Sequence, residues 1–148
     1  NENRFDVHEI TFSCPVLTGE QKGFDVKVSL GMMLGALSNL VDNSIYWLQI
    51  RWPKDRSRRA IYIGTTDFYE EGPALVFADN GPGLPTNSAE LTKPFVTTKP
   101  DGMGLGLYYV NLVCELNGAR LIISPDRTDV GIPRAYSGAA FAIVFNKG

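Results

Sequence analysis

The chain has 148 residues, of which 44% are hydrophobic and 20% are charged, a composition typical of globular proteins rather than disordered or fibrous ones. Its 14 basic and 16 acidic residues give a net charge of −2, which does not indicate nucleic acid or a membrane surface as a partner. No apolar run reaches the ~20 residues that a membrane-spanning helix needs. We therefore expect one domain, residues 1–148, with a single hydrophobic core.

The chain opens on Asn1 and shows no signal peptide, so we expect it to be part of a longer protein. Cys14 and Cys114 lie among apolar or small residues, which predicts two reduced, buried thiols and an intracellular protein. With two cysteines and one histidine, a zinc site is not expected.

The first half of the chain predicts two strands and a helix. Residues 7–17 and 24–30 have the composition of strands around a glycine-containing turn. From Met32 to about Gln49 the apolar period becomes helical, and Pro53 ends this run. One face of this helix is predicted to be the apolar stripe Leu34, Leu37, Val41, Ile45 and Leu48, and a different face to carry Asn39, Asn43 and Tyr46.

The second half alternates strands with one more helix. Residues 60–66 and 73–79 predict strands, and residues 84–101, which lack an apolar period, predict a long loop of the kind that serves as a lid. A helix is predicted from about Gly104 to Asn117, with Gly118 as its C-cap and with Leu105, Tyr109, Leu112 and Leu116 as its apolar stripe. Strands over 119–124 and 138–146 complete a mixed sheet with helices on one face, which is a two-layer α/β sandwich.

Two polar segments stand out in the first half of this pattern. Asn39 and Asn43 share a helix face, where an amide oxygen could bind Mg²⁺, although a solvated helix face explains the pair equally well. Asp79 ends an apolar strand and could accept a hydrogen bond from a purine amino group. Gly81 and Gly83 would let a flat ring lie on the backbone, or they simply form a turn.

A third polar segment contains Gly102, Gly104 and Gly106, which precede and open the second predicted helix. Main-chain N–H groups at a helix N-terminus bind phosphate, but the spacing matches neither the P-loop nor the dinucleotide fingerprint. Taken separately, each of the three segments is a weak signal. Their order along the chain is much more specific.

In this order the sequence resembles the GHKL superfamily of ATPases and kinases, over residues from about 24 to the end. "NLVDNS" is similar to the N box, "DNGPG" to the first glycine box, "KPFVTTK" to the F box and "GMGLGL" to the second glycine box. The resemblance implies a Bergerat-type α/β sandwich with ATP and Mg²⁺ as ligands.

Residue roles follow from the same resemblance. Asp79 would recognise the adenine amino group, Asn43 would hold Mg²⁺, and residues 84–103 would form a lid whose Lys99 contacts phosphate. The implied ATP-binding residues are Asn39, Asn43, Tyr46, Asp79, Gly81, Gly83, Thr98, Lys99, Gly102, Gly104, Leu105, Gly106 and Leu107.

Position 39 indicates the branch of the superfamily. Members that hydrolyse ATP commonly carry a glutamate four residues before the magnesium asparagine, whereas this chain has Asn39, whose amide cannot take a proton from water. The sequence therefore most resembles the catalytic domain of sensor histidine kinases. It departs from that branch at Tyr46, where kinases usually have Lys or Arg, and at Ala139-Ala140, where they often have Gly-Thr.

The resemblance predicts a cytoplasmic protein-histidine kinase domain of two-component signalling that donates the γ-phosphoryl of ATP to a histidine outside this chain. Asn39 would be its catalytic position, and the isolated domain would show little activity. Expected partners are the dimerisation and phosphoacceptor helices of the parent protein and a response regulator, with no nucleic acid and no membrane contact. The alternatives are a conformational ATPase or clamp module and a degenerate nucleotide-binding scaffold. The basic segment Arg51, Lys54, Arg56, Arg58 and Arg59 is expected to be a solvated turn.

Overall fold

The structure is a computed structural model that describes residues 11–13, 23–24, 26–84 and 106–146. The elements in chain order are β1 (Thr11–Ser13), α3 (Leu30–Arg51), the 3₁₀ turn η1 (Arg56–Arg58), β2 (Ala60–Thr66), β3 (Ala74–Asp79), α4 (Gly106–Leu116), β4 (Ala119–Ile123), α5 (Arg127–Val130) and β5 (Ala140–Phe145).

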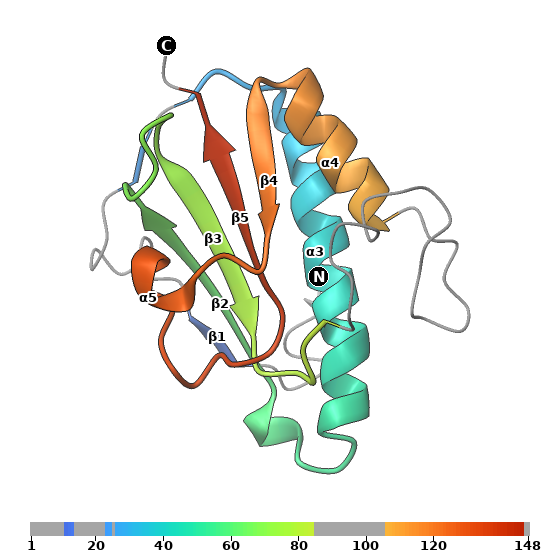
Figure 1. The fold of residues 1–148 in the computed structure, drawn as a ribbon. Coiled ribbons are helices and arrows are strands. Elements are labelled where there is room, and N and C mark those ends of the chain that lie inside the picture. The colour runs from blue at the N-terminus through green and yellow to red at the C-terminus, as the bar shows by residue number, and fades with distance from the viewer. Residues whose placement is uncertain (1–10, 14–22, 25, 85–105, 147–148) are drawn as a thin grey trace.

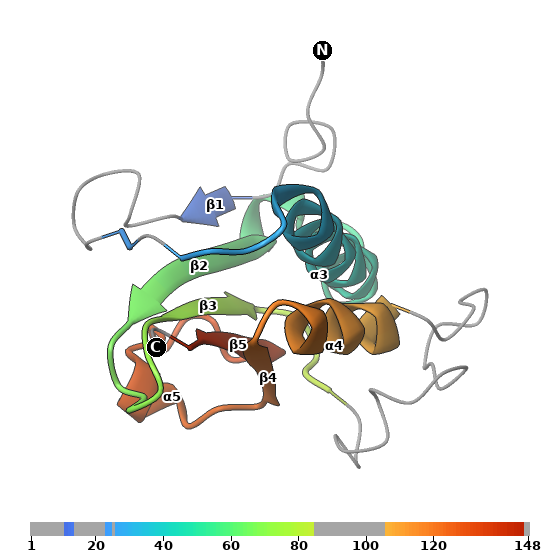
Figure 2. The ribbon, with the colours of Figure 1, turned by 90° about the horizontal axis from the view of Figure 1, so that it is seen from above.

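The strands form one mixed sheet in the order β1-β2-β3-β5-β4. β1 pairs with β2 in parallel, and the other neighbours pair antiparallel. The long helices α3 and α4 lie side by side over one face of the sheet (Figures 1 and 2). The predicted two-layer α/β sandwich is therefore confirmed.

The opposite face of the sheet is covered by α5 and the residues that follow it. Val130 and Ile132 pack there against Tyr62, Val76 and Ala78, while Phe141, Ile143 and Phe145 of β5 face the helices. Because both faces of β5 are covered, all six of its residues are buried. The sequence predicts the alternation in β5, but it does not predict that α5 covers the other face of the sheet.

Helix α3 begins after Ser29, whose side chain accepts a hydrogen bond from Met32 N at 3.4 Å, as an N-cap does. The predicted stripe is confirmed in part, because Ile45 and Leu48 are buried and Leu37 and Val41 pack against the core, whereas Leu34 is 55% exposed. Apolar residues surround most of this helix, so periodicity alone could not decide which stripe faces the sheet. The buried residues are Met33, Ala36, Leu40, Ser44, Ile45 and Leu48.

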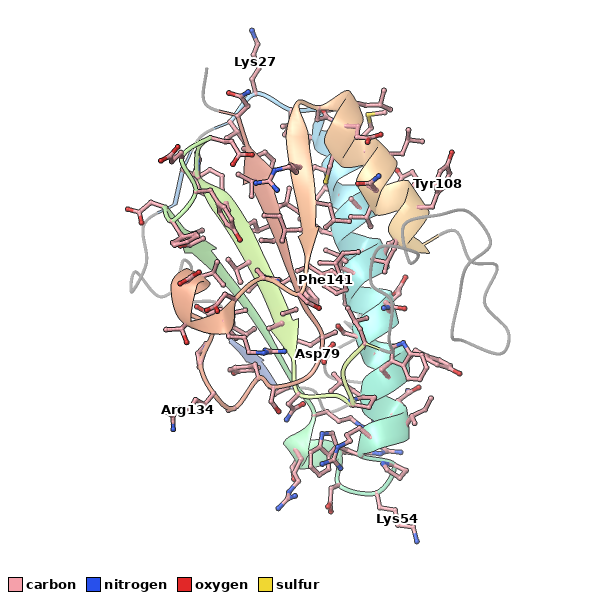
Figure 3. The ribbon with its side chains drawn as sticks, in the orientation of Figure 1. Lys27, Lys54, Asp79, Tyr108, Arg134 and Phe141 are labelled. Atoms are coloured by element: carbon pink, nitrogen blue, oxygen red, sulfur yellow. The ribbon has the colours of Figure 1, made fainter. Side chains whose placement is uncertain are left out.

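Helix α4 also turns a different face inward. Val110, Val113 and Cys114 are buried, whereas Leu112 and Leu116 are 37% and 62% exposed, so the predicted apolar stripe was wrong. Packing against both α3 and β4 explains the choice, because compact side chains let the three elements approach closely. Tyr108 points away from the molecule (Figure 3). Gly118 adopts the left-handed conformation expected of a C-cap, with φ of 68°.

The N-terminal segment corrects the predicted pair of strands. Of residues 7–17, the structure describes only the three of β1, and its described residues in 24–30 belong to no strand before α3 begins. They contribute side chains instead, because Phe24, Val26 and Val28 pack against the main core and the Phe24 ring lies 5.6 Å from that of Phe145. Apolar alternation here reflects packing and not sheet pairing.

Two further predictions concern thiols and membranes. Cys114 is buried and free, as predicted, and burial raises the pKa of its thiol to about 11; Cys14 lies outside the described residues. Over the described ranges, no helix combines the length and apolar character needed to cross a bilayer.

Candidate functional site

The candidate site centres on Asp79, the last residue of β3, which points toward α3 (Figure 3). Its side chain is only 2% exposed. One carboxylate oxygen, Oδ2, accepts a hydrogen bond from Ser44 Oγ of α3 at 2.6 Å. The other, Oδ1, accepts from Gly81 N at 2.9 Å and Ala139 N at 3.1 Å. Three donors from separate parts of the chain therefore fix the carboxylate.

Burial is the largest influence on Asp79 and raises the pKa of its carboxyl above the ordinary value of 3.8. The hydrogen bonds from Ser44, Gly81 and Ala139, and then the charge of Arg127, act in the opposite direction and favour the anion. A carboxylate oxygen can accept more than one hydrogen bond, so Oδ2 has capacity for a donor besides Ser44. The group is suited to bind an N–H of a ligand.

Gly138 borders the same carboxylate, and the space there admits no side chain. A Cβ on this residue would lie 2.3 Å from Asp79 Oδ1 and 2.5 Å from Gly81 N, closer than non-bonded atoms can approach. Its N–H donates to Asp79 O at 2.7 Å, and Asp79 N donates to Ala139 O at 3.0 Å. The main chain of residues 138–139 thus forms hydrogen bonds with both the main chain and the side chain of Asp79.

Gly81 and Gly83 lie where the sequence predicts a turn after the strand. Gly81 is buried, and a Cβ on it would lie 3.1 Å from Asp79 Oδ1. Gly83 has a φ of 89°, a conformation that glycine adopts readily and other residues avoid. Glycine therefore avoids a tight contact with Asp79 at the first position and allows the required backbone conformation at the second.

Asn80 joins this turn to the end of α3. Its side chain accepts from Ala60 N at 2.9 Å and donates to Arg58 O at 2.6 Å, and its main-chain oxygen accepts from Trp52 Nε1 at 3.1 Å. The basic turn nearby is mostly exposed, as predicted, except that Arg59 is buried and donates to Trp52 O. These bonds hold the segment that follows Asp79.

The other predicted residues of α3 lie on the helix that supplies Ser44. Asn43 is half-buried and immediately precedes Ser44. Asn39 is also half-buried, and its Nδ2 donates to Gly35 O at 3.0 Å. Tyr46 is half-buried with its ring 4.9 Å from that of Trp47. Of these three residues of α3, Asn43 is the closest along the chain to Ser44, which donates to the Asp79 carboxylate.

At the start of α4, Gly106 is the first helical residue and Leu107 packs against the main core. The remaining predicted positions lie outside the described residues, as does most of the predicted lid 84–103: they are Thr98, Lys99, Gly102, Gly104 and Leu105. The structure thus brings together Asp79 and Gly81, and it leaves the phosphate end of the predicted site undescribed.

Sequence reasoning missed two residues of this site, Ser44 and Gly138. Ser44 directly follows Asn43, and Gly138 directly precedes the alanines that depart from the kinase pattern. Ser44 is the last residue of the recognised segment "NLVDNS", and Gly138 lies beside a recognised position, but the contacts with Asp79 cross 35 residues of chain for Ser44 and 60 for the neighbouring Ala139. Only the folded arrangement reveals them.

The donor set can be tested against Mg²⁺, which usually keeps several waters and takes few protein ligands, with phosphate oxygens completing its shell. A single amide oxygen, such as that of Asn43, is compatible with this preference. Within the part of the chain that the structure describes, no three His, Cys, Asp or Glu side chains gather in a way that could hold a metal ion.

Comparison with known proteins gives matches in both sequence and fold. Residues 33–146 match the family described as Histidine kinase-, DNA gyrase B-, and HSP90-like ATPase. The sensor protein kinase PilS of Pseudomonas aeruginosa is 36% identical over 87 residues, which are 57% of this chain and 16% of PilS. The chain thus spans less than a fifth of the length of this relative.

Solved structures share the fold at lower sequence identity. The catalytic domain of histidine kinase ThkA, in a nucleotide-free form, superposes with a TM-score of 0.70 at 22% identity, over 97% of this chain and 83% of that one. Full-length ShkA in complex with AMPPNP has a TM-score of 0.58 at 18% identity, over 90% of this chain and 24% of that one.

Proposed function

Because the chain belongs to the histidine kinase-, DNA gyrase B- and HSP90-like ATPase family, we propose that it binds ATP at Asp79 and serves as the catalytic domain of a sensor histidine kinase. The observation that carries this proposal is the buried Asp79 carboxylate, held by Ser44, Gly81 N and Ala139 N. It is an acceptor with remaining capacity, bordered by glycines.

Adenine recognition follows from the polarity of this site. The 6-amino group of adenine is a donor, and a carboxylate is an acceptor at both oxygens. In a buried site the bond to a charged acceptor is strong, and a base that presents a carbonyl oxygen there instead would meet the carboxylate's negative charge. The site therefore favours ATP over GTP. ShkA, which shares the fold, was solved with the ATP analogue AMPPNP.

The phosphate end of the ligand is assigned by the sequence motifs. Asn43 would hold Mg²⁺, which when bound neutralises phosphate charge and polarises the γ-phosphoryl. Lys99 and the glycines of 102–106 would contact the phosphates, and Tyr46 and Leu107 would border the nucleotide. Asn39 cannot act as a general base, and its Nδ2 already donates to Gly35 O. The residues of α3 therefore orient ATP without activating water.

In this mechanism the γ-phosphoryl passes to a histidine on another part of the parent protein, and catalysis consists mainly of positioning and charge stabilisation. The partners are the dimerisation and phosphoacceptor helices and a response regulator that accepts the phosphoryl in turn. The cytoplasm, where ATP is available, is the corresponding location.

The experiment compares Asp79→Asn with wild type by calorimetric titration of ATP. In the variant, one amide oxygen can still accept the main-chain N–H groups, but its NH₂ then presents a donor to the adenine amino group. We expect a loss of at least about tenfold in affinity, because a hydrogen bond to a charged group is worth ~1.5–3 kcal/mol. Asp67→Asn, on the exposed β2–β3 connection, is the matched control and should bind like wild type. Equal ATP affinity in Asp79→Asn and wild type would refute the adenine assignment.

The kinase assignment needs the longer protein. The isolated domain should bind ATP and hydrolyse it very slowly, whereas the longer protein should form an acid-labile phosphohistidine. Steady ATP turnover without phosphohistidine would contradict the kinase assignment and favour a conformational ATPase.

A further inference from the structure

Arg127 is the first residue of α5, on the face of the sheet opposite to α3 and α4 (Figure 2). Its side chain is half-buried. The guanidinium donates two hydrogen bonds to main-chain oxygens, from Nη1 to Tyr136 O and from Nη2 to Gly138 O. Both bonds end on the segment that leads into β5 and borders Asp79.

The second of these bonds acts on a peptide unit that Asp79 also uses. Gly138 O and Ala139 N belong to the same peptide group. Its oxygen accepts from the cationic guanidinium, while its N–H donates to Asp79 Oδ1 at 3.1 Å. A hydrogen bond to the oxygen of a peptide polarises that peptide and strengthens donation by its N–H. The charge of Arg127 is thereby connected to the Asp79 carboxylate through one peptide unit.

The first bond fixes the direction from which this peptide approaches. Tyr136 N donates to Pro133 O at 3.0 Å, and the Tyr136 ring lies 5.3 Å from that of Tyr62 on β2. Because the rigid guanidinium of Arg127 donates to both Tyr136 O and Gly138 O, the turn between these two residues is held at two points. Gly138 N then donates to Asp79 O at 2.7 Å.

We propose that Arg127 is a positioning residue for base recognition, which holds the 136–139 segment from the outer face of the sheet so that Ala139 N orients the Asp79 carboxylate toward the adenine amino group. This proposal rests on the proposed function, because it assigns Arg127 a part in the same recognition. In support, the positive charge of Arg127 also lowers the pKa of Asp79, although by less than the direct hydrogen bonds do.

The test replaces Arg127 by lysine, which keeps the positive charge but cannot form the bidentate pair of hydrogen bonds. Affinities are measured by calorimetry for ATP and for purine riboside triphosphate, which lacks the 6-amino group. We expect Arg127→Lys to weaken ATP binding about fivefold to tenfold, the range for one weakened hydrogen bond to a charged group, and to change analogue binding less than twofold. Arg127→Met, which keeps the apolar stem, should reduce the preference for ATP further.

Arg120→Lys is the matched control, because the guanidinium of Arg120 also donates a bidentate pair of hydrogen bonds, at 2.8 and 3.0 Å to Glu71. This pair lies on the exposed edge of the sheet. The control variant should leave both affinities at the wild-type values. Thermal unfolding verifies that each variant is folded, and Arg127→Lys alone decides the question if Arg127→Met does not fold.

Two results would overturn the role of Arg127 while leaving the proposed function intact. One is an unchanged ATP affinity in Arg127→Lys, and the other is an equal loss for ATP and the analogue, which would indicate a purely structural role. If Asp79→Asn binds ATP and the analogue in the wild-type ratio, adenine recognition is not at Asp79, and both proposals fall together.

Discussion

The hydrogen bond between Ser44 and Asp79 offers the sharpest test of how the site is built. Ser44 Oγ lies 2.6 Å from Asp79 Oδ2, and both residues are 2% exposed. The change Ser44→Ala removes the hydroxyl and little else, because the small side chain of alanine fits the same position. The variant leaves a buried carboxylate oxygen without this donor.

The expected cost comes from two opposing effects. Loss of a hydrogen bond to a charged group costs about 1.5–3 kcal/mol. Alanine favours the helix over serine by about 0.5 kcal/mol, which offsets part of this loss. The net decrease in the free energy of unfolding is therefore about 1–2.5 kcal/mol. For a domain of this size, each kcal/mol lowers Tm by about 2–4 °C, so the expected decrease in Tm is about 2–10 °C.

The decrease should depend on pH in a defined direction. Burial raises the pKa of Asp79 above its ordinary value, so the protonated carboxyl contributes to the free energy of unfolding. This contribution is fully present below about pH 3.8 and is lost as pH rises through the folded-state pKa. The bond from Ser44 lowers that pKa, so Ser44→Ala raises it further and deepens the loss on the alkaline side. The stability difference between the variant and wild type should therefore be larger at neutral pH than in acid.

Thermal and urea unfolding, followed by circular dichroism between about pH 4 and pH 8, measures this difference. Ser38→Ala is the control, because it makes the same change at an exposed position of the same helix and should be neutral or slightly stabilising. Equal stability of the two variants at neutral pH, or a deficit in Ser44→Ala that grows on acidification, would refute this account of the carboxylate.

Three other predictions concern Gly138, Asn43 and Cys114. Gly138→Ala would place a Cβ 2.3 Å from Asp79 Oδ1, so in chemical unfolding we expect at least about 2 kcal/mol of destabilisation, together with loss of ATP binding. The control Gly31→Ala, with no atom within 4 Å of its Cβ, should instead stabilise the helix by ~0.5–1 kcal/mol. Asn43→Ala should weaken ATP binding with Mg²⁺ present much more than without it, and equal losses in calorimetry would make Asn43 structural. Burial raises the pKa of Cys114 to about 11, so its thiol should not react with a disulfide reagent at neutral pH until the protein unfolds. The reaction is measured in a variant whose other cysteine, Cys14, is replaced by serine. Rapid labelling of the native protein would contradict the burial of Cys114.

Local sequence signals identified the acceptor and the elements that carry it. A strand ending in Asp79, followed by Gly81 and Gly83, is recognisable because strand and turn chemistry act over a few residues. The faces of the two long helices were predicted only in part, because Ile45 and Leu48 of α3 are buried as expected while Leu34 is exposed. Each has apolar residues around most of its circumference, and the buried face was decided by contacts with the sheet and with the other helix. The short helix α5 was missed despite its capping residue Asp126, because four residues give no period to detect.

The donors to Asp79 show why the departure at 139–140 does not affect this contact. The sequence departs from the kinase pattern at this point, with Ala139 and Ala140 where kinases often have a glycine and a threonine. In the structure the position bonds Asp79 through its main chain, since Ala139 N donates to Oδ1. A main-chain donor is present whatever the side chain, provided that the backbone is held in place. This part of the site therefore requires a glycine at position 138 and a turn whose backbone is held in place. Arg127 holds that turn through its two hydrogen bonds from the opposite face of the sheet.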